Sequence, residues 1–133
     1  MRRVFLDTVG LLALWNAQDQ WHGPARRALG ELTAEGVDFW TTTHVLPECG
    51  NAAAHTPFRH AVIEVRQHLA EAGRLIAPTD GDCAEAWATY ARAQAGDAGI
   101  VEQVSFAVMR RLAIGEAFTN DQHFRAAGFQ MLF

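Results

Sequence analysis

Short apolar runs alternate along the chain with longer segments in which apolar residues recur at helical spacing. The first run, Val4-Phe5-Leu6, leads directly into Asp7 and is typical of a short buried strand. Three further runs share this character, and the predicted strands lie at residues 4–6, 37–41, 75–77 and 116–119. Residues 129–133 form one more apolar run at the end of the chain.

Helices are predicted between these strands, because apolar residues there recur at the spacing of a helical face. They cover about residues 8–15, 24–36, 57–73, 80–95 and 100–113, with one more after residues 42–44 and a short one from residue 121. Strands that alternate with helices form βαβ units, which build a mostly parallel sheet covered on both faces. The pattern therefore predicts an α/β fold, with the carboxyl ends of the strands on one edge.

Length and composition fit one folded unit without a linker or a repeat. With 133 residues, 50% of them hydrophobic, the chain can bury one substantial core and hardly two. The net charge of −4 argues against a protein that holds nucleic acid by bulk charge alone. Cys49 and Cys83 lack metal-ligand spacing and are interpreted as reduced thiols. No apolar run approaches the roughly 20 residues of a membrane span, so we expect a cytoplasmic protein without membrane contact.

Two aspartates, Asp7 and Asp121, each follow an apolar strand and open a helix. If the two strands are parallel neighbours, both carboxylates lie on the same sheet edge, where α/β folds bind their ligands. Either aspartate alone is explained equally well as a helix N-cap that accepts hydrogen bonds from free backbone N–H groups. The pair therefore indicates a site only if further carboxylates converge on it.

Glu48 and Glu102 are the further candidates. Glu48 lies in the first turn of the helix after the second strand, where the helix dipole alone favours a glutamate. Glu102 lies on a helix that is apolar nearly all round, with Phe106 and Met109 on its own face. A carboxylate on such an enclosed face needs a partner, because burying an unpaired charge is costly. Either an arginine or a metal ion would supply that partner.

Four carboxylates gathered at one edge, namely Asp7, Glu48, Glu102 and Asp121, repel each other unless a cation joins them. Ligation by oxygen atoms alone suits Mg²⁺ or Mn²⁺. Such ions hold phosphate oxygens and activate a water molecule for attack on phosphorus. The residues therefore indicate a divalent metal site and phosphodiester cleavage.

Three segments together resemble a PIN domain: Val4-Phe5-Leu6-Asp7-Thr8, Val45-Leu46-Pro47-Glu48, and residues 117–124 followed by Gly128-Phe129. The similarity is greatest to the small VapC-type toxins of bacterial toxin–antitoxin pairs, and it covers the whole chain. It implies a single PIN-like domain over residues 1–133, built as a three-layer α/β/α sandwich on a mostly parallel sheet of four to five strands. It also implies a Mg²⁺- or Mn²⁺-dependent endoribonuclease that cleaves an RNA substrate. Such a protein is expected to be blocked by a cognate antitoxin and to form a homodimer.

The resemblance assigns the acidic residues one by one. Asp7 matches the first acid of the family, Glu48 the central glutamate and Asp121 the last aspartate. Glu102 stands where relatives place an aspartate, and Asp97, which lies before that helix, is a substitute outside this register. The resemblance thus implies that Asp7, Glu102 and Asp121 hold the metal, directly or through water, and that Glu48 completes the site by binding or positioning water.

The exchange of aspartate for Glu102 leaves a second function open. The extra methylene moves the carboxylate by up to about 1.5 Å, and Mg²⁺ requires close to octahedral geometry. The alternative is a PIN-fold protein that binds RNA or a protein partner with weak or no nuclease activity. A DNA-directed phosphodiesterase of the flap type is a third hypothesis, but 133 residues leave little room for the clamping elements it needs.

Overall fold

Strands and helices alternate along the chain in the computed structural model, which describes all 133 residues. The strands are β1 (Arg3–Leu6), β2 (Asp38–Thr42), β3 (Leu75–Ile76), β4 (Glu116–Phe118) and β5 (Gln130–Met131). The helices are α1 (Thr8–Trp15), α2 (His22–Ala34), α3 (Val45–Ala53), α4 (Arg59–Glu71), α5 (Asp80–Arg92), α6 (Ile100–Leu112) and α7 (Gln122–Ala126). Each predicted element is present, and the final apolar run supplies the fifth strand.

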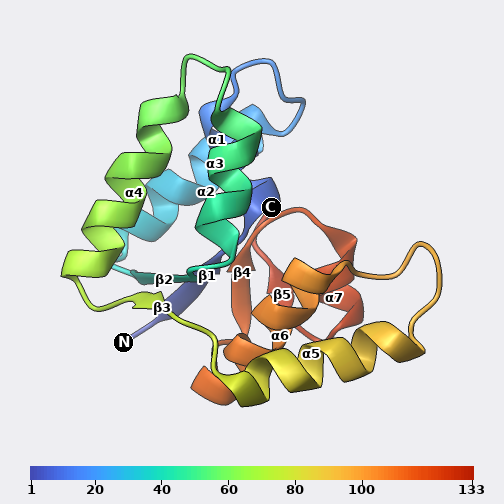
Figure 1. The fold of residues 1–133 in the computed structure, drawn as a ribbon. Helices are drawn as coiled ribbons and strands as arrows, with labels where there is room; N and C mark the ends of the chain where they lie inside the picture. Colours follow the sequence, from blue (N-terminus) through green and yellow to red (C-terminus); the bar gives the residue numbers. More distant parts are fainter.

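The five strands form one sheet in the order β3-β2-β1-β4-β5, and every neighbouring pair is parallel. Helices α1 to α4 cover one face of the sheet, and α5, α6 and α7 cover the other (Figure 1). This arrangement confirms the predicted α/β/α sandwich. None of the helices combines the length and the hydrophobicity needed to cross a bilayer.

The strand order reverses direction between β1 and β4. From β1 the chain moves outward to β2 and β3, and it then returns through α5 and α6 to the opposite side of β1. Helices leave the sheet on opposite faces at such a point, so a crevice remains outside the carboxyl ends of the two central strands. Asp7 directly follows β1, and Thr119 directly follows β4, so both lie at this crevice.

The largest difference from a predicted helix boundary is at the end of α5. Helix α5 ends at Arg92, whereas apolar spacing extended it to Ala95, because Ala93 adopts an extended conformation. The carboxylate of Asp97 then accepts a hydrogen bond from the backbone N–H of Gln94 at 2.8 Å. This side-chain bond holds residues 94–97 in a turn instead of a further helical turn.

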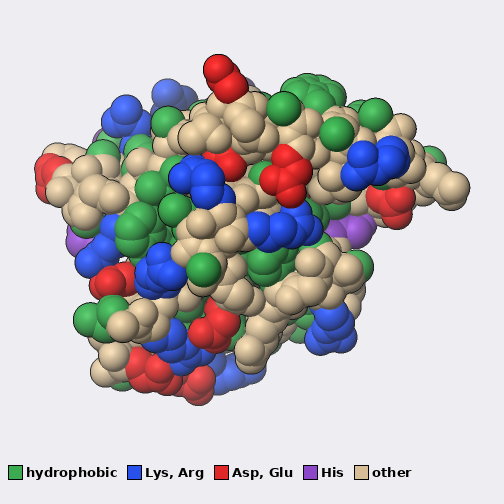
Figure 2. Space-filling view, turned by 90° about the horizontal axis from the view of Figure 1, so that it is seen from below, with side chains coloured by type: hydrophobic (Ala, Val, Ile, Leu, Met, Phe, Trp, Pro, Cys, Tyr) green, Lys and Arg blue, Asp and Glu red, His purple; other side chains and the backbone are tan.

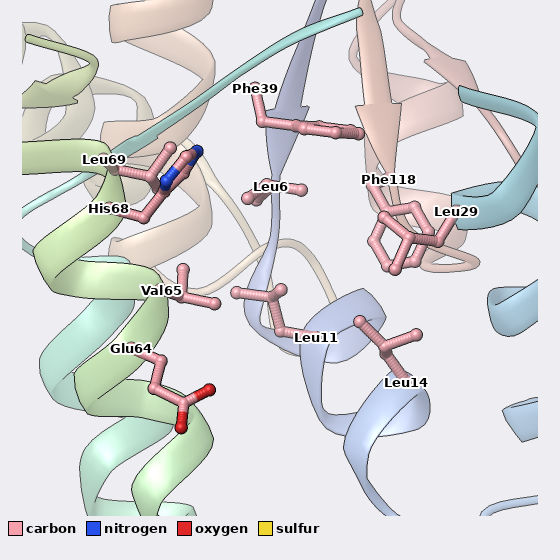
Figure 3. A pocket seen from close by; sticks show the side chains of 10 residues that line it. All are labelled: Leu6, Leu11, Leu14, Leu29, Phe39, Glu64, Val65, His68, Leu69 and Phe118. Atoms are coloured by element: carbon pink, nitrogen blue, oxygen red, sulfur yellow. The ribbon is translucent and has the colours of Figure 1, made fainter. Parts of the chain in front are cut away.

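Packing between the sheet and the helices of the first face leaves an apolar cavity of about 240 Å³. Side chains from α1, α2, α4 and the central strands point toward it (Figure 3). Its lining consists of Leu6, Leu11, Leu14, Leu29, Phe39, Glu64, Val65, His68, Leu69 and Phe118. The cavity therefore lies beside α1, the helix that Asp7 caps.

Helix α1 approaches β4 so closely that only glycine fits at one position. A Cβ atom on Gly10 would lie 1.9 Å from the carbonyl oxygen of Phe118, well inside van der Waals contact. Since Phe118 is fully buried, neither backbone has free space to move into. The close contact sets the distance between the start of α1 and the end of β4, and hence between Asp7 and the residues that follow Phe118.

The substitution Gly10→Ala is therefore expected to lower the free energy of unfolding by about 2–4 kcal/mol, through overpacking against a backbone atom. Gly30→Ala is the matched control. Gly30 is exposed on α2, and a Cβ atom there would meet nothing within 4 Å. This control is expected to raise stability by about 0.5–1 kcal/mol. Urea denaturation of both variants checks the prediction, and equal effects at the two positions would contradict it.

Candidate active site

Asp7 supplies the buried carboxylate at the crevice, and the residue is only 3% exposed. Asp7 is the N-cap of α1, and its Oδ2 accepts a hydrogen bond from the backbone N–H of Val9 at 3.3 Å. The hydroxyl of Thr119 donates a second bond to the same oxygen at 2.9 Å. Both the capping role and the sheet-edge position predicted for Asp7 are thus present together, and the other carboxylate oxygen makes no hydrogen bond within the protein.

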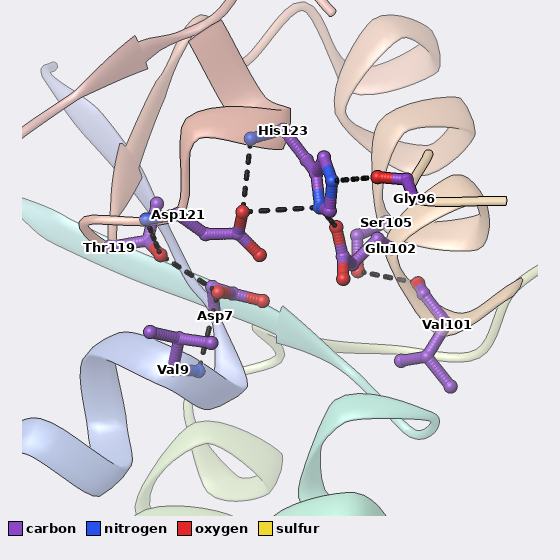
Figure 4. Close-up of polar contacts among 9 residues, drawn as sticks. All are labelled: Asp7, Val9, Gly96, Val101, Glu102, Ser105, Thr119, Asp121 and His123. Atoms are coloured by element: carbon purple, nitrogen blue, oxygen red, sulfur yellow. Dashed lines mark hydrogen bonds and ion pairs between the residues drawn. The ribbon is translucent and has the colours of Figure 1, made fainter. Parts of the chain in front are cut away.

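Asp121 reaches the same crevice from β4 (Figure 4). It is the N-cap of α7, and its Oδ1 accepts a hydrogen bond from the backbone N–H of His123 at 3.0 Å. Its own backbone N–H donates to the hydroxyl oxygen of Thr119 at 3.1 Å. Thr119 therefore connects the two aspartates, because its hydroxyl accepts from one residue and donates to the other.

Glu102, in the first turn of α6, completes the group of converging carboxylates. Its Oε2 lies 2.8 Å from Nδ1 of His123, and that nitrogen is also 3.2 Å from Oδ1 of Asp121. The other ring nitrogen, Nε2, donates to the carbonyl oxygen of Gly96 at 2.9 Å. The partner expected for Glu102 was an arginine or a metal ion, and in this structure it is an imidazole instead.

His123 is the functional candidate that the sequence did not single out. The sequence feature that could have indicated His123 is its position two residues after Asp121, within the first turn of α7. A side chain there points back over the helix N-terminus, as the cap itself does. The contact with Glu102 depends on how α6 packs beside α7, which no local pattern predicts.

The electrostatics of the group follow from burial and like charge. The pKa of Asp7 is raised to about 7, mainly by burial; the hydrogen bond from Thr119 opposes this rise, and the charges of Asp121 and Glu102 contribute to it. Burial also raises the pKa of Glu102, with a further contribution from Asp121, while His123 lowers it. The hydrogen bond to the Gly96 carbonyl raises the pKa of His123, and the two neighbouring carboxylates act in the same direction.

These residues fit a divalent cation. Glu102, Asp121 and His123 each offer a ligand atom, and the three atoms lie within 4.8 Å of one another. Carboxylate oxygens suit Mg²⁺ or Mn²⁺, and a histidine that donates its second N–H to a backbone carbonyl is oriented as metal ligands are. The hydroxyl of Thr8, next to Asp7 in the chain, is fully buried and has no hydrogen-bond partner by distance and angle.

Two other predicted acidic residues lie outside this hydrogen-bonded group. Glu48 is in the first turn of α3, as predicted, but it is exposed and makes no hydrogen bond or ion pair. Asp97 is occupied by its bond to the N–H of Gln94 and is not part of the cluster. The structure thus brings Asp7, Glu102 and Asp121 together around one space, whereas a role for Glu48 stays a prediction.

Comparison with known proteins gives one relative of similar length. VapC20 of Mycobacterium tuberculosis, named as a 23S rRNA-specific endonuclease, is 32% identical over 134 aligned positions that cover 95% of each chain. Its crystal structure, described as that of a sarcin–ricin loop cleaving toxin, matches with a TM-score of 0.75 at 30% identity and covers 95% of both chains. No family model matches the chain.

Two more distant structures share the fold. FitAB bound to a DNA fragment has a TM-score of 0.71 at 17% identity, covering 96% of this chain and 92% of the other. FitAcB from Neisseria gonorrhoeae has a TM-score of 0.67 at 16% identity, covering 98% of this chain and 96% of the other. At such identities the likeness concerns the fold alone.

The raised pKa of Asp7 predicts that this carboxylate destabilises the folded protein at neutral pH. The folded state holds the proton up to about pH 7, whereas the unfolded chain releases it near 3.8, so stability falls as the pH rises between these values. Asp7→Asn is expected to raise the free energy of unfolding at pH 8 by about 1–3 kcal/mol in metal-free buffer. The difference should shrink toward pH 4, as measured by urea denaturation at several pH values.

Asp82→Asn is the matched control with the opposite sign. Asp82 is also buried, but its two oxygens accept hydrogen bonds from Nε and Nη2 of Arg111 at 3.0 and 2.8 Å, which lowers its pKa. This carboxylate stabilises the fold above the pKa of the unfolded chain, and the contribution is lost as the pH falls. Its removal is expected to cost about 1–3 kcal/mol at pH 8. A loss of stability at pH 8 in both variants would contradict the prediction that the ionised Asp7 carboxylate destabilises the fold.

Proposed function

The chain belongs to the VapC family of PIN-domain ribonuclease toxins, and on this premise we propose that it hydrolyses RNA phosphodiester bonds at the crevice between β1 and β4. The observation that carries the proposal is the convergence of Asp7, Glu102 and Asp121 on one space at the strand ends. One buried and two partly buried carboxylates that repel each other favour a cation site over a set of separate helix caps.

We propose Mg²⁺ or Mn²⁺ as the cofactor, held by Asp7, Glu102 and Asp121 directly or through water. When bound, such an ion polarises the scissile phosphate and lowers the pKa of the attacking water. Glu48 would position that water from the first turn of α3. The donor set supports this assignment, because three carboxylates and an oriented imidazole face the same space.

Two residues hold the ligands in place in this proposal. Thr119 fixes one oxygen of Asp7, which leaves the second oxygen free to bind the ion. His123 holds the longer side chain of Glu102 against Asp121, at 2.8 and 3.2 Å from their carboxylate oxygens. This contact fixes the longer side chain of Glu102. Glutamate in place of the family's usual aspartate is therefore compatible with a working site.

We propose ribosomal RNA as the substrate class, from the relationship to VapC20, and the cytoplasm as the place of the proposed activity. A cognate antitoxin and a second copy of the chain are the proposed protein partners. The apolar cavity beside α1 offers a surface for apolar side chains of an antitoxin, since eight of its lining residues are Leu, Phe or Val from different elements. Binding there would reach the helix that Asp7 caps.

The test is cleavage of ribosomal RNA, including an isolated sarcin–ricin loop RNA, with Mg²⁺ or Mn²⁺ added and with the metals chelated. Asp7→Asn and Glu102→Gln are each expected to reduce the cleavage rate by about 100-fold or more, since loss of an outer-shell partner alone costs 10–100-fold. Glu31→Gln, an exposed carboxylate on α2 without a side-chain bond, is the control for a lost charge. Equal cleavage by the wild type and Asp7→Asn would reject the assignment.

Calorimetric titration with Mn²⁺ separates this function from a PIN-fold protein that binds without cutting. The wild type is expected to bind the ion, and Asp7→Asn and Glu102→Gln to bind it at least about 10-fold more weakly. Absence of binding in the millimolar range, together with absence of cleavage, would favour the binding protein.

A further inference from the structure

A second cavity, of about 350 Å³, lies on the far side of His123 from Asp7, between α5, α6 and α7. Its volume falls in the range of about 300–1,000 Å³ that is usual for small-ligand sites. It is lined by Thr89, Arg92, Ala93, Asp97, Ala98, Gln103, Phe106, Arg110, His123, Ala126 and Ala127. Because His123 contacts the acidic group and also lines this cavity, the two spaces adjoin across one imidazole ring.

Gln103 lines the cavity with a polar side chain that has no partner. The residue follows Glu102 on α6 and is only 8% exposed, yet its side-chain amide makes no hydrogen bond within the protein. An amide carries two donors and an acceptor, and those of Gln103 keep access to solvent, since the only fully buried side-chain atoms without a partner are Thr8 Oγ1 and Trp40 Nε1. Its free hydrogen-bonding atoms are thus available to a group that enters the cavity.

Neither of the two arginines at the cavity makes a short hydrogen bond to a carboxylate. Arg92 has one contact, at 3.5 Å, with the hydroxyl of Thr89. Arg110 lies over the ring of Phe129 at 5.6 Å and is 3.6 Å from exposed Glu85. Arg111, the next residue on α6, is instead bound through two nitrogens to Asp82 and does not line the cavity. Arg92 thus has no carboxylate partner, and Arg110 has only a long, exposed ion pair with Glu85 that an anion in the cavity would compete with.

The rest of the lining suits a flat, partly apolar group. Four alanines, at positions 93, 98, 126 and 127, leave room, and Phe106 supplies an aromatic surface. One carboxylate, that of Asp97, is also present, and it is bonded to the N–H of Gln94. On the face that carries α5, acidic and basic side chains are interspersed (Figure 2). A polyanion would therefore be held there by individual arginines rather than by a broad basic surface.

We propose that this cavity binds an unpaired nucleotide of the RNA substrate, next to the phosphate that is cleaved. Gln103 hydrogen-bonds to the base or the ribose, and Arg92 and Arg110 hold the adjoining phosphates. The proposal rests on the proposed ribonuclease function and adds a specificity site to it. Proteins that read RNA sequence commonly take up single, unstacked nucleotides in this way, through amide hydrogen bonds and contacts with aromatic rings or guanidinium groups.

The test measures binding without cleavage. Full-length Asp7→Asn protein in metal-free buffer is titrated into fluorescent oligo(A), oligo(C) and oligo(U) RNAs at several salt concentrations, with anisotropy as the signal. Each phosphate contact with single-stranded nucleic acid contributes about 0.7 to the slope of log affinity against log salt. Adding Arg92→Ala and Arg110→Ala together is therefore expected to reduce that slope by about 1.4 and to weaken binding of all three RNAs at least about 10-fold at low salt.

Gln103→Met keeps the length of the side chain and removes its hydrogen-bonding atoms. It is expected to leave the salt slope unchanged and to reduce the difference in affinity among the three RNAs by at least about 5-fold. The control is Arg26→Ala with Arg66→Ala, which removes the same charge from exposed positions on α2 and α4. Thermal unfolding of each variant confirms that it is folded.

Three results would overturn the proposal: absence of RNA binding at the lowest salt, equal slopes for the cavity and control double variants, or unchanged discrimination in Gln103→Met. Titration with free AMP, CMP and UMP shows whether the cavity binds a mononucleotide rather than a nucleotide within an RNA strand. Mononucleotide binding that Gln103→Met weakens, without any effect of the variants on RNA, would also overturn it. A wild type that cleaves RNA while these variants behave as the control rejects the cavity alone, whereas a wild type that does not cleave rejects the proposed function.

Discussion

The parallel pairing of β1 with β4 is the constraint on which the rest of the structure depends. Leu6 lies opposite Phe118 in this pairing, so the residues that follow them, Asp7 and Thr119, meet where the strands end. The hydrogen bond between their side chains, at 2.9 Å, is a direct result of that register. Gly10 allows α1 to start beside β4 without a clash, which keeps the carboxylate at the crevice.

Gathering negative charge at this point opposes folding, and the protein reduces the cost locally. Asp7 is buried beside Asp121 and Glu102, so its ionised form is disfavoured. His123 provides a nearby positive group, because the Gly96 carbonyl and the carboxylates all favour its protonated state. A metal ion would replace this partial compensation by a full one. The same charges that destabilise the folded chain are therefore the basis for the proposed cation binding, as is common at functional sites.

The cavity behind His123 extends this arrangement toward recognition. In the proposed function the acidic group acts at any phosphate, since nothing in it distinguishes one base from another. The unpaired amide of Gln103 and the two arginines lie on the same helices, α5 and α6, that frame the site from the second face of the sheet. Helix α6 thus carries Glu102 toward the crevice and Gln103 toward the cavity at successive positions.

Local pattern was sufficient to predict the strands, the parallel sheet and the positions of Asp7 and Asp121, because a strand-end aspartate before a helix is visible in a few adjacent residues. It also placed Glu102 on a largely enclosed helix that required a partner. It did not identify His123 as that partner, and it did not single out Gln103. Both depend on contacts between elements far apart in the chain: α6 with α7, and α5 with α6.

The chain by itself thus determined which elements form and which of them end in a carboxylate, since hydrophobic periodicity and capping are properties of neighbouring residues. Only the tertiary structure decided which carboxylates share one space. The exposed position of Glu48 and the engagement of Asp97 by its own turn show why, because each satisfies the sequence pattern without joining the hydrogen-bonded group. Side-chain convergence depends on helix packing across the sheet, and packing is set by the whole core rather than by any one segment.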